Sequence, residues 1–148
     1  MLFYEMMILR LRPAETAESV LDIDYARLRL LGQQAILFDF DGTLAKKGSA
    51  CMPADSSALL SELAGRGFRL AILTNRRAHR VIANVTVPII YHARKPRRSG
   101  YLSLLRQLEV EPGNCAMIGD RIITDVLGGN RLGMHTVRVR HHPQDHRE

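Results

Sequence analysis

Two aspartates at the end of an apolar segment are the strongest candidates for chemistry in this sequence. Residues 35–44 read Ala-Ile-Leu-Phe-Asp-Phe-Asp-Gly-Thr-Leu, and the run around Asp39 is typical of a strand buried on both faces. A carboxylate in such a place requires a cation, hydrogen-bond donors or a chemical role, because an unpaired buried charge is costly. Since side chains alternate along a strand, Asp39 and Asp41 can point to the same side.

Other polar residues follow the later apolar segments of the chain. They are Thr74 and Asn75, Lys95, Asp120, and Asp125 in the helix that we expect after Asp120. The carboxylates offer the hard oxygen ligands that suit Mg²⁺, and the remaining side chains offer donors and one positive charge. Together they predict a site for a phosphate and its magnesium ion.

The two aspartates of residues 35–44 can divide the work of phosphoryl transfer. Asp39 belongs to the more rigid strand and is the better candidate for the nucleophile that forms an aspartyl-phosphate. Asp41 lies one step into the loop, where it can protonate the leaving oxygen and then deprotonate the attacking water. Two neighbouring carboxylates tend to separate in pKa, which favours such a division.

The elements that must position these residues alternate between strand and helix. We expect strands at residues 35–40, 68–73, 88–91, 115–118 and 134–139, and helices at 53–65, 76–85, 99–108 and 124–132. This alternation predicts an α/β fold with a parallel five-stranded sheet and helices on both faces. In such folds ligands bind at the carboxyl ends of the strands, which is where the polar residues fall.

The two ends of the chain flank this unit, and we expect residues 1–148 to form a single domain. Helical spacing from Pro13 and a cap at Asp24 predict that residues 1–33 are an N-terminal helical extension. Residues 1–11 are apolar, and we expect them to pack on the core rather than lie in a membrane interface. Residues 140–148, with His141, His142 and His146, are expected to be a flexible tail rather than a metal site.

Composition limits the partners and the compartment. The 148 residues are 46% hydrophobic and 24% charged, as in a globular protein, and the net charge of +6 favours anionic partners. The two cysteines, Cys51 and Cys115, lie outside any CxxC pattern and indicate reduced thiols in the cytoplasm. No apolar run approaches the roughly 20 residues of a membrane span. A peripheral contact with an anionic membrane surface and the oligomeric state stay open.

The motifs together resemble a known family. Phe38-Asp39-Phe40-Asp41-Gly42-Thr43-Leu44, Leu73-Thr74-Asn75, Lys95-Pro96 and the run from Gly119-Asp120 to Thr124-Asp125 resemble, in order and spacing, the four motifs of the haloacid dehalogenase (HAD) superfamily of phosphohydrolases. Residues 93–96 and 119–131 resemble more narrowly its class IIIA, the YqeG-type phosphatases. The resemblance covers roughly residues 13–139.

This resemblance implies a Rossmann-like three-layer α/β/α fold and a magnesium-dependent phosphatase that acts through an aspartyl-phosphate. It implies that Asp39, the backbone carbonyl of Asp41, and Asp120 hold Mg²⁺, with Asp125 as a further candidate ligand. Asp39, Asp41 and Lys95 would be catalytic, and Thr74, Asn75 and Lys95 would bind the phosphorylated substrate. Residues 45–52 and 75–95 are too short for a large cap domain, so the site should be open.

The substrate class stays open at this stage. YqeG-type phosphatases resemble the mitochondrial and plastid phosphatidylglycerophosphate phosphatases, which makes a lipid phosphate one candidate. The alternative is a non-catalytic module that binds anionic lipid or nucleic acid through its net charge and the basic residues 94–98. No aromatic residues interleave that cluster, so nucleic acid is disfavoured. The four carboxylates favour the enzyme, because a pure anion binder gains nothing from them.

Overall fold

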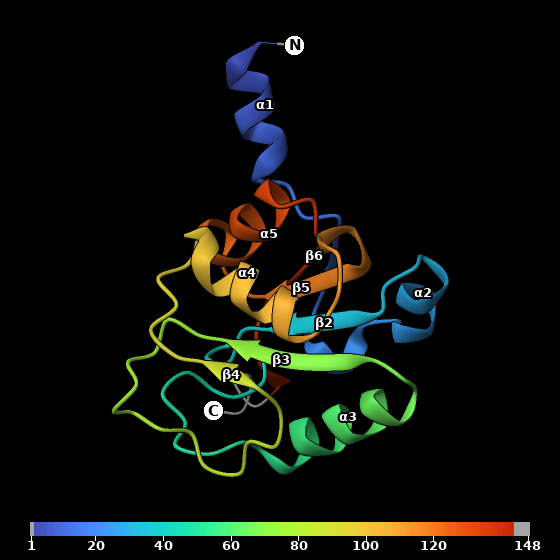
Figure 1. Ribbon diagram of the computed structural model, residues 1–148. Helices are drawn as coiled ribbons and strands as arrows, with labels where there is room; N and C mark the ends of the chain where they lie inside the picture. Colours follow the sequence, from blue (N-terminus) through green and yellow to red (C-terminus); the bar gives the residue numbers. More distant parts are fainter. Residues whose placement is uncertain (1, 144–148) are drawn as a thin grey trace.

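Parallel strands form one sheet in the computed structural model, which describes residues 2–143 (Figure 1). Their order across the sheet is β1 (Glu15–Ala17), β6 (His135–Val139), β5 (Cys115–Gly119), β2 (Ala35–Phe38), β3 (Arg69–Leu73) and β4 (Ile89–Ile90). The central strand β2 pairs with β3 on one side and with β5 on the other. The predicted parallel α/β fold is confirmed, but the described part of the chain has six strands rather than five.

The additional strand, β1, replaces part of the helix that was predicted from Pro13. Glu15 lies opposite Val137 of β6, the backbone N–H of Ala14 donates to the Thr136 carbonyl at 2.9 Å, and the Glu15 carboxylate lies 2.8 Å from the His135 ring. Pairing with a sheet edge therefore overrides the local helical spacing. The predicted cap is confirmed, because Asp24 accepts a hydrogen bond from Arg27 at the start of α2 (Tyr25–Leu30).

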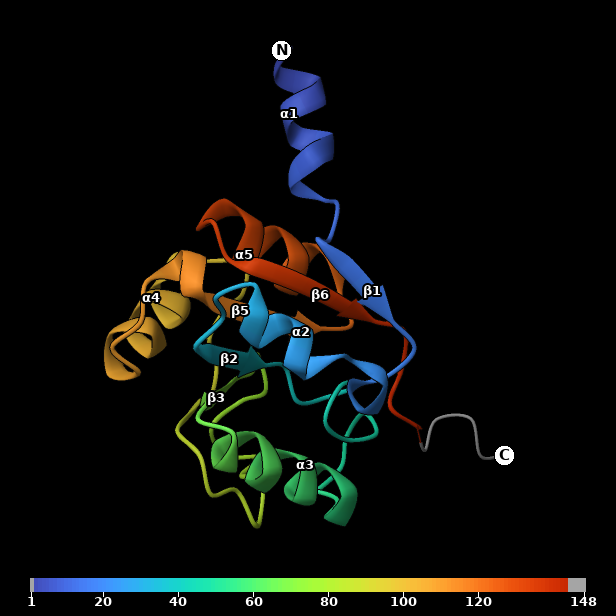
Figure 2. The ribbon, with the colours of Figure 1, turned by 90° about the vertical axis from the view of Figure 1, so that its right-hand side faces the viewer.

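Helices cover both faces of the sheet, which makes three layers (Figures 1 and 2). The layer with α2 and α3 (Ala54–Gly65) packs on one face, together with the short 3₁₀ turn η1 (Val20–Asp22). The opposite layer holds α4 (Arg98–Gln107), the π-helical segment η3 (Ile122–Leu127) and α5 (Gly128–Arg131), and the turn η2 (Pro112–Asn114) precedes β5. Along β2, Ile36 and Phe38 join the first apolar cluster whereas Ala35 and Leu37 join the second.

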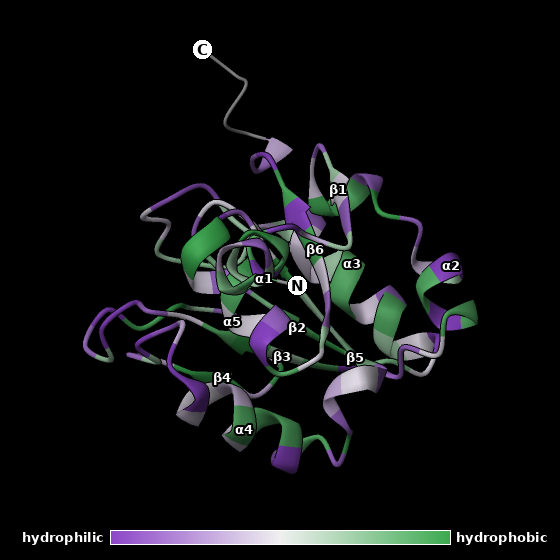
Figure 3. Cartoon of the chain, turned by 90° about the horizontal axis from the view of Figure 1, so that it is seen from above, coloured by the Kyte–Doolittle hydropathy of each residue, from purple (hydrophilic) through white to green (hydrophobic). Residues whose placement is uncertain are grey.

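The fully buried central strand β2 explains why the Asp39 carboxylate has a rigidly fixed position. All four residues of β2 are buried, and the hydropathy colouring of Figure 3 shows β2 and β3 as mainly hydrophobic. Such a strand has its backbone fixed by two neighbours and its side chains fixed by two layers. Asp39, the next residue, therefore leaves the core in a defined direction.

The helix predicted at residues 76–85 is not formed. The segment is a loop whose backbone forms hydrogen bonds with other segments. The N–H of Ile82 donates to the Tyr91 hydroxyl at 2.9 Å, and Ala83 exchanges backbone hydrogen bonds with Ala50 and Met52. These contacts tie the loop to residues 45–52. Neither segment has room for a large cap, as predicted.

Helix α1 (Phe3–Arg10) projects away from the other elements (Figures 1 and 2). None of its residues is buried, so the prediction that residues 1–11 pack on the core is wrong. The chain turns directly from α1 into the edge strand β1, and Asn130 fixes this turn by donating to the carbonyls of Arg10 and Arg12. Over the described residues, the structure contains no helix long and apolar enough to cross a membrane.

The tail predicted at residues 140–148 is described only as far as residue 143. In that part His142 is buried. His146 lies outside the described residues, so the flexible tail stays a prediction.

Candidate active site

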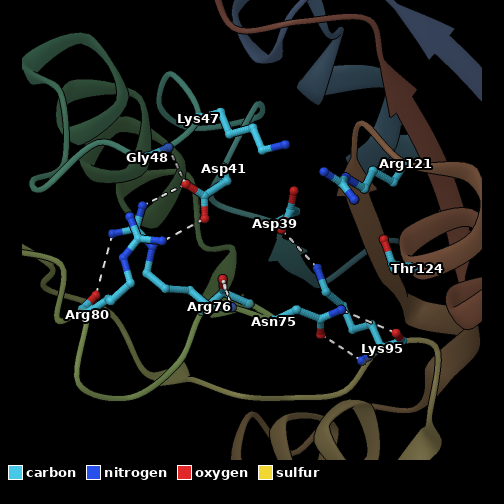
Figure 4. Close-up of a pocket in the computed structure, with 11 residues that line it drawn as sticks. Asp39, Asp41, Lys47, Gly48, Asn75, Arg76, Arg80, Lys95, Arg121 and Thr124 are labelled. Carbon is cyan, nitrogen blue, oxygen red and sulfur yellow. Dashed lines mark hydrogen bonds and ion pairs between the residues drawn. The ribbon is translucent and has the colours of Figure 1, made fainter.

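The carboxyl ends of the central strands surround a cavity of about 280 Å³ (Figure 4). Five of the predicted site residues line it: Asp39, Asp41, Thr74, Asn75 and Lys95. The other two are Asp120 and Asp125. One carboxylate oxygen from each of them and one from Asp39 lie within 4.8 Å of one another. Strand ends far apart in the sequence thus bring all seven residues to one place.

Lys95 links two of the carboxylates. Its ammonium group is almost fully buried and donates to Asp39 Oδ1 at 2.9 Å and to Asp125 Oδ1 at 2.7 Å. Burial lowers the pKa of Lys95, but the negative charges of Asp39 and Asp125 outweigh burial and raise the pKa of Lys95 above its ordinary value. Lys95 is therefore a fixed positive charge at the floor of the cavity.

One ammonium group does not satisfy three acidic neighbours. Burial, with a smaller contribution from the neighbouring Asp120, raises the pKa of Asp39 to about 6 against the opposing charge of Lys95. Burial and the charge of Asp39 likewise raise the pKa of Asp125 to about 6. The protein alone leaves this cluster short of positive charge, which a bound cation would supply.

The cluster fits a divalent metal ion with a preference for oxygen. Asp120 Oδ1 is buried and has no hydrogen-bond partner among the described residues, as expected for an atom that faces a ligand. Gly42, at φ +82°, passes so close to Asp120 that a Cβ on it would lie 2.5 Å from Asp120 Oδ2. This close approach brings the loop after Asp41 against the acidic cluster, and the donor set is the one that Mg²⁺ prefers.

Asp41 points away from this cluster toward Arg76 (Figure 4). Arg76 Nη2 donates to Asp41 Oδ1 at 2.6 Å and Arg76 Nε donates to Oδ2 at 3.3 Å, while the N–H of Gly48 donates to Oδ1 at 2.8 Å. Burial pushes the pKa of Asp41 upward, but the hydrogen bonds from Arg76 and Gly48 outweigh burial and hold the pKa below its ordinary value. Asp41 is thus ionised and tethered in this state.

Thr74 and Asn75 shape the site through the backbone. Thr74 is buried and its hydroxyl accepts the Arg76 N–H at 3.0 Å. Asn75 brackets the backbone of Lys95, accepting from its N–H at 2.7 Å and donating to its carbonyl at 3.3 Å. The side chain of Asn75 therefore positions Lys95, while its direct contact with substrate stays a prediction.

The cavity has further lining residues that the sequence patterns did not reveal. They are Lys47, Gly48, Arg76, Arg80, Arg121 and Thr124. Arg76 was assigned to a helix because of its spacing, although its place directly after a strand-end Thr-Asn pair is a usable signal. Of the basic run at residues 94–98, only Lys95 lines the cavity.

Comparison of the sequence with known proteins gives consistent matches. The model of a family described as HAD-hydrolase-like matches residues 92–147. The protein named probable phosphatase YqeG from Bacillus subtilis is 31% identical over 130 residues, which cover 86% of this chain and 76% of that protein. The chloroplastic phosphatidylglycerophosphate phosphatase 1 from Chlamydomonas reinhardtii is 28% identical over 139 residues, and this chain spans about half (52%) of its length.

Solved structures share the fold at low sequence identity. A HAD phosphatase from Thermococcus onnurineus superposes with a TM-score of 0.58 at 17% identity, over 73% of this chain and 86% of the other. A 2-haloacid dehalogenase from Pseudomonas syringae gives a TM-score of 0.55 at 15% identity, over 72% and 86% of the two chains. These likenesses support the three-layer α/β/α architecture.

Proposed function

Since this chain belongs to the haloacid dehalogenase superfamily and is a phosphatase of that type, we propose that it hydrolyses phosphomonoesters with Mg²⁺ and an aspartyl-phosphate on Asp39. The observation that carries the proposal is the buried bridge from Lys95 to Asp39 and Asp125. Beside it lies Asp120 Oδ1, which has no hydrogen-bond partner within residues 2–143. A structural ion pair needs no third carboxylate with a free oxygen. A phosphate site with a metal ion does.

Mg²⁺ would be held by Asp39, the backbone carbonyl of Asp41, and Asp120, with Asp125 in reach of the same space. When bound, it would offset the repulsion between the carboxylates and the phosphate. The remaining chemistry belongs to the side chains. Lys95 fixes the direction of Asp39 and adds a permanent positive charge, and the hydroxyl of Thr74 can donate to a phosphate oxygen.

In the first step a carboxylate oxygen of Asp39 forms a bond to phosphorus, and the bond from phosphorus to the leaving oxygen breaks. Because Asp41 is ionised while Arg76 holds it, Asp41 must first leave Arg76 and take up a proton from solvent, which it then gives to the leaving oxygen. In the second step ionised Asp41 takes a proton from a water whose oxygen bonds to phosphorus, and phosphate departs from Asp39. Arg76 favours the ionised form of Asp41, which is the form that the second step requires.

A lipid phosphate resembling phosphatidylglycerophosphate is the substrate that we propose. The site has no large cap, its mouth is basic, and one relative is named as a phosphatase of that lipid. Helix α1 exposes large apolar side chains, among them Phe3, Tyr4 and Ile8, with Arg10 at its end, a composition that suits peripheral contact with an anionic membrane surface. We propose a cytoplasmic protein that works at that surface.

The test is phosphate release from an aryl phosphate and from phosphatidylglycerophosphate in detergent micelles. Both activities should require Mg²⁺, disappear in chelator and return when Mg²⁺ is restored. Asp39→Asn should reduce turnover by about a thousandfold or more while the protein stays folded. Unchanged turnover in Asp39→Asn would remove the proposed nucleophile and leave a module that only binds anions.

A further inference from the structure

Exposed cations from separate loops surround the mouth of the cavity. Lys47 comes from the loop after Asp41, Arg80 from the loop after β3, and Arg121 from the turn after β5. Figure 4 shows Lys47 and Arg121 pointing from opposite sides toward the space beside Asp39. All three side chains are exposed, unlike Lys95 and Arg76, which are buried in ion pairs.

Hydrogen bonds fix the loops that carry these cations to the acidic residues of the site. The N–H of Gly48, next to Lys47, donates to Asp41 at 2.8 Å, and the N–H of Arg121 donates to Asp125 Oδ2 at 3.2 Å. The carbonyl of Arg80 lies 3.5 Å from Arg76 Nη1. The side chains are exposed to solvent, whereas the backbone that carries them is held by hydrogen bonds to residues of the site.

With a metal ion and one phosphomonoester bound, the site would keep an excess of positive charge. The carboxylates of Asp39, Asp41, Asp120 and Asp125 are matched by the buried cations Lys95 and Arg76 together with a divalent metal ion. The exposed cations then face the substrate with three positive charges. A phosphomonoester dianion supplies two negative charges, so one cation is left for another anionic group on the same molecule.

We propose that Lys47, Arg80 and Arg121 form a second anion subsite, so that the preferred substrate is a phosphomonoester that also carries a phosphodiester a few bonds away. Arginine forks and lysine ammonium groups bind phosphate oxygens by charge-assisted hydrogen bonds. The inference rests on the proposed function, since it concerns the same site. The phosphodiester belongs either to a membrane lipid headgroup or to a water-soluble molecule.

The experiment compares substrates with and without the phosphodiester. Glycerol 1-phosphate carries one phosphate, glycerophosphoglycerol phosphate is soluble and carries the added diester, and phosphatidylglycerophosphate in neutral micelles presents the same headgroup on a lipid. We expect Lys47→Gln with Arg121→Gln to lower kcat/KM about thirtyfold for both two-phosphate substrates and about threefold for glycerol 1-phosphate. Lys46→Gln with Arg77→Gln is the matched control, because both residues are exposed neighbours outside the cavity.

Other outcomes would overturn the subsite. An equal loss on all three substrates would assign the cations to the reacting phosphate, and no loss on any would remove them from substrate binding. If kcat/KM fell only for the lipid substrate, and fell equally in the control variant, the effect would come from general attraction to a charged surface.

A binding measurement separates this proposal from the proposed function. In Asp39→Asn protein, calorimetric titration with glycerophosphoglycerol phosphate should give about tenfold weaker binding when Lys47 and Arg121 are also replaced by Gln. If no substrate were hydrolysed, the proposed function would fail while this difference could still be measured. Equal affinities of the two proteins would overturn the subsite by itself.

Discussion

Arg76 holds Asp41 by two hydrogen bonds, from Nη2 to Oδ1 at 2.6 Å and from Nε to Oδ2 at 3.3 Å, and its guanidinium also lies 5.0 Å from the centre of the Phe40 ring. The guanidinium is therefore fixed by the residues on either side of the Phe40–Asp41 bond. Because Asp41 has to release Arg76 before it can carry a proton, this pair sets the acid and base behaviour of the site.

Replacing Arg76 with Gln should shift the pH profile. Arg76 lowers the pKa of Asp41 against burial, so its removal lets burial raise that pKa and shrinks the ionised fraction between about pH 4 and 6. Hydrolysis of the aspartyl-phosphate needs ionised Asp41. The ratio of kcat at about pH 5 to kcat at pH 7.5 should therefore be about fivefold lower in Arg76→Gln than in native protein. Arg77→Gln, outside the cavity, is the control, and an unshifted Arg76→Gln profile would contradict this role.

Replacing Asp41 with Asn should separate substrates by their leaving groups. An aryl oxygen departs without help, whereas an alkyl oxygen needs a proton as the bond to phosphorus breaks. We expect phosphoryl transfer from an alkyl phosphate to slow about a hundredfold more than transfer from a nitrophenyl phosphate, measured by single-turnover kinetics. Equal losses on the two substrates would show that Asp41 acts by shaping the metal site.

Most of the fold follows from local signals in the sequence. The run that ends at Asp39 is apolar enough to be identified as a central strand, and the alternation of strands and helices after it predicts a parallel sheet. The edge strand β1 could not be predicted, because its three residues gain their structure from partners such as Val137 in β6, more than a hundred residues away. The prediction that residues 1–11 pack on the core was wrong, because an apolar segment is buried only where another element of the fold packs against it.

The candidate site follows from sequence to the extent that its residues end strands. Asp39, Thr74 and Asp120 could be grouped because the ends of parallel strands share one edge of the sheet. The tether from Arg76 to Asp41 and the placement of Lys47 depend on the paths of two loops that pair with each other through Cys51 and Ala83. Loop paths are set by tertiary contacts, which leave no periodic signal in the sequence.

Replacing Lys95 with Met should destabilise the protein in a pH-dependent way. The change leaves Asp39 and Asp125 buried without their cation, which costs about 3 kcal/mol of unfolding free energy at neutral pH. Without Lys95 the pKa of both carboxyls rises further above the unfolded value, so the folded state binds more protons than the unfolded state. Its stability then falls as pH rises through the interval between the unfolded and folded pKa values.

Urea unfolding in chelator at about pH 5 and pH 7.5 measures this effect. The gap between native protein and Lys95→Met should be smaller at the lower pH, where protonated carboxyls need no partner. Adding Asp125→Asn to Lys95→Met removes one orphaned carboxylate and should recover about half of the loss at pH 7.5. A gap of the same size at both pH values would show that Lys95 acts through packing alone.

Replacing Gly42 with Ala should weaken the metal site more than the fold. The added Cβ would lie 2.5 Å from Asp120 Oδ2, so the Asp120 carboxylate has to move, and φ +82° adds backbone strain of about 1 kcal/mol. Gly133→Ala is a matched control, because φ there is +81° and no atom lies within 4 Å of the added Cβ. Both variants should therefore lose similar stability in chelator.

Saturating Mg²⁺ should raise the Tm of native protein and of Gly133→Ala by about 5 °C, since binding only to the folded state stabilises it. In Gly42→Ala the rise at the same Mg²⁺ concentration should be less than half as large, and Asp120→Asn should abolish it. The rise should also shrink from pH 7.5 to about pH 5, because protons compete for Asp39 and Asp125, whose pKa values burial raises to about 6. An equal rise in Gly42→Ala and Gly133→Ala would exclude Asp120 from the metal site.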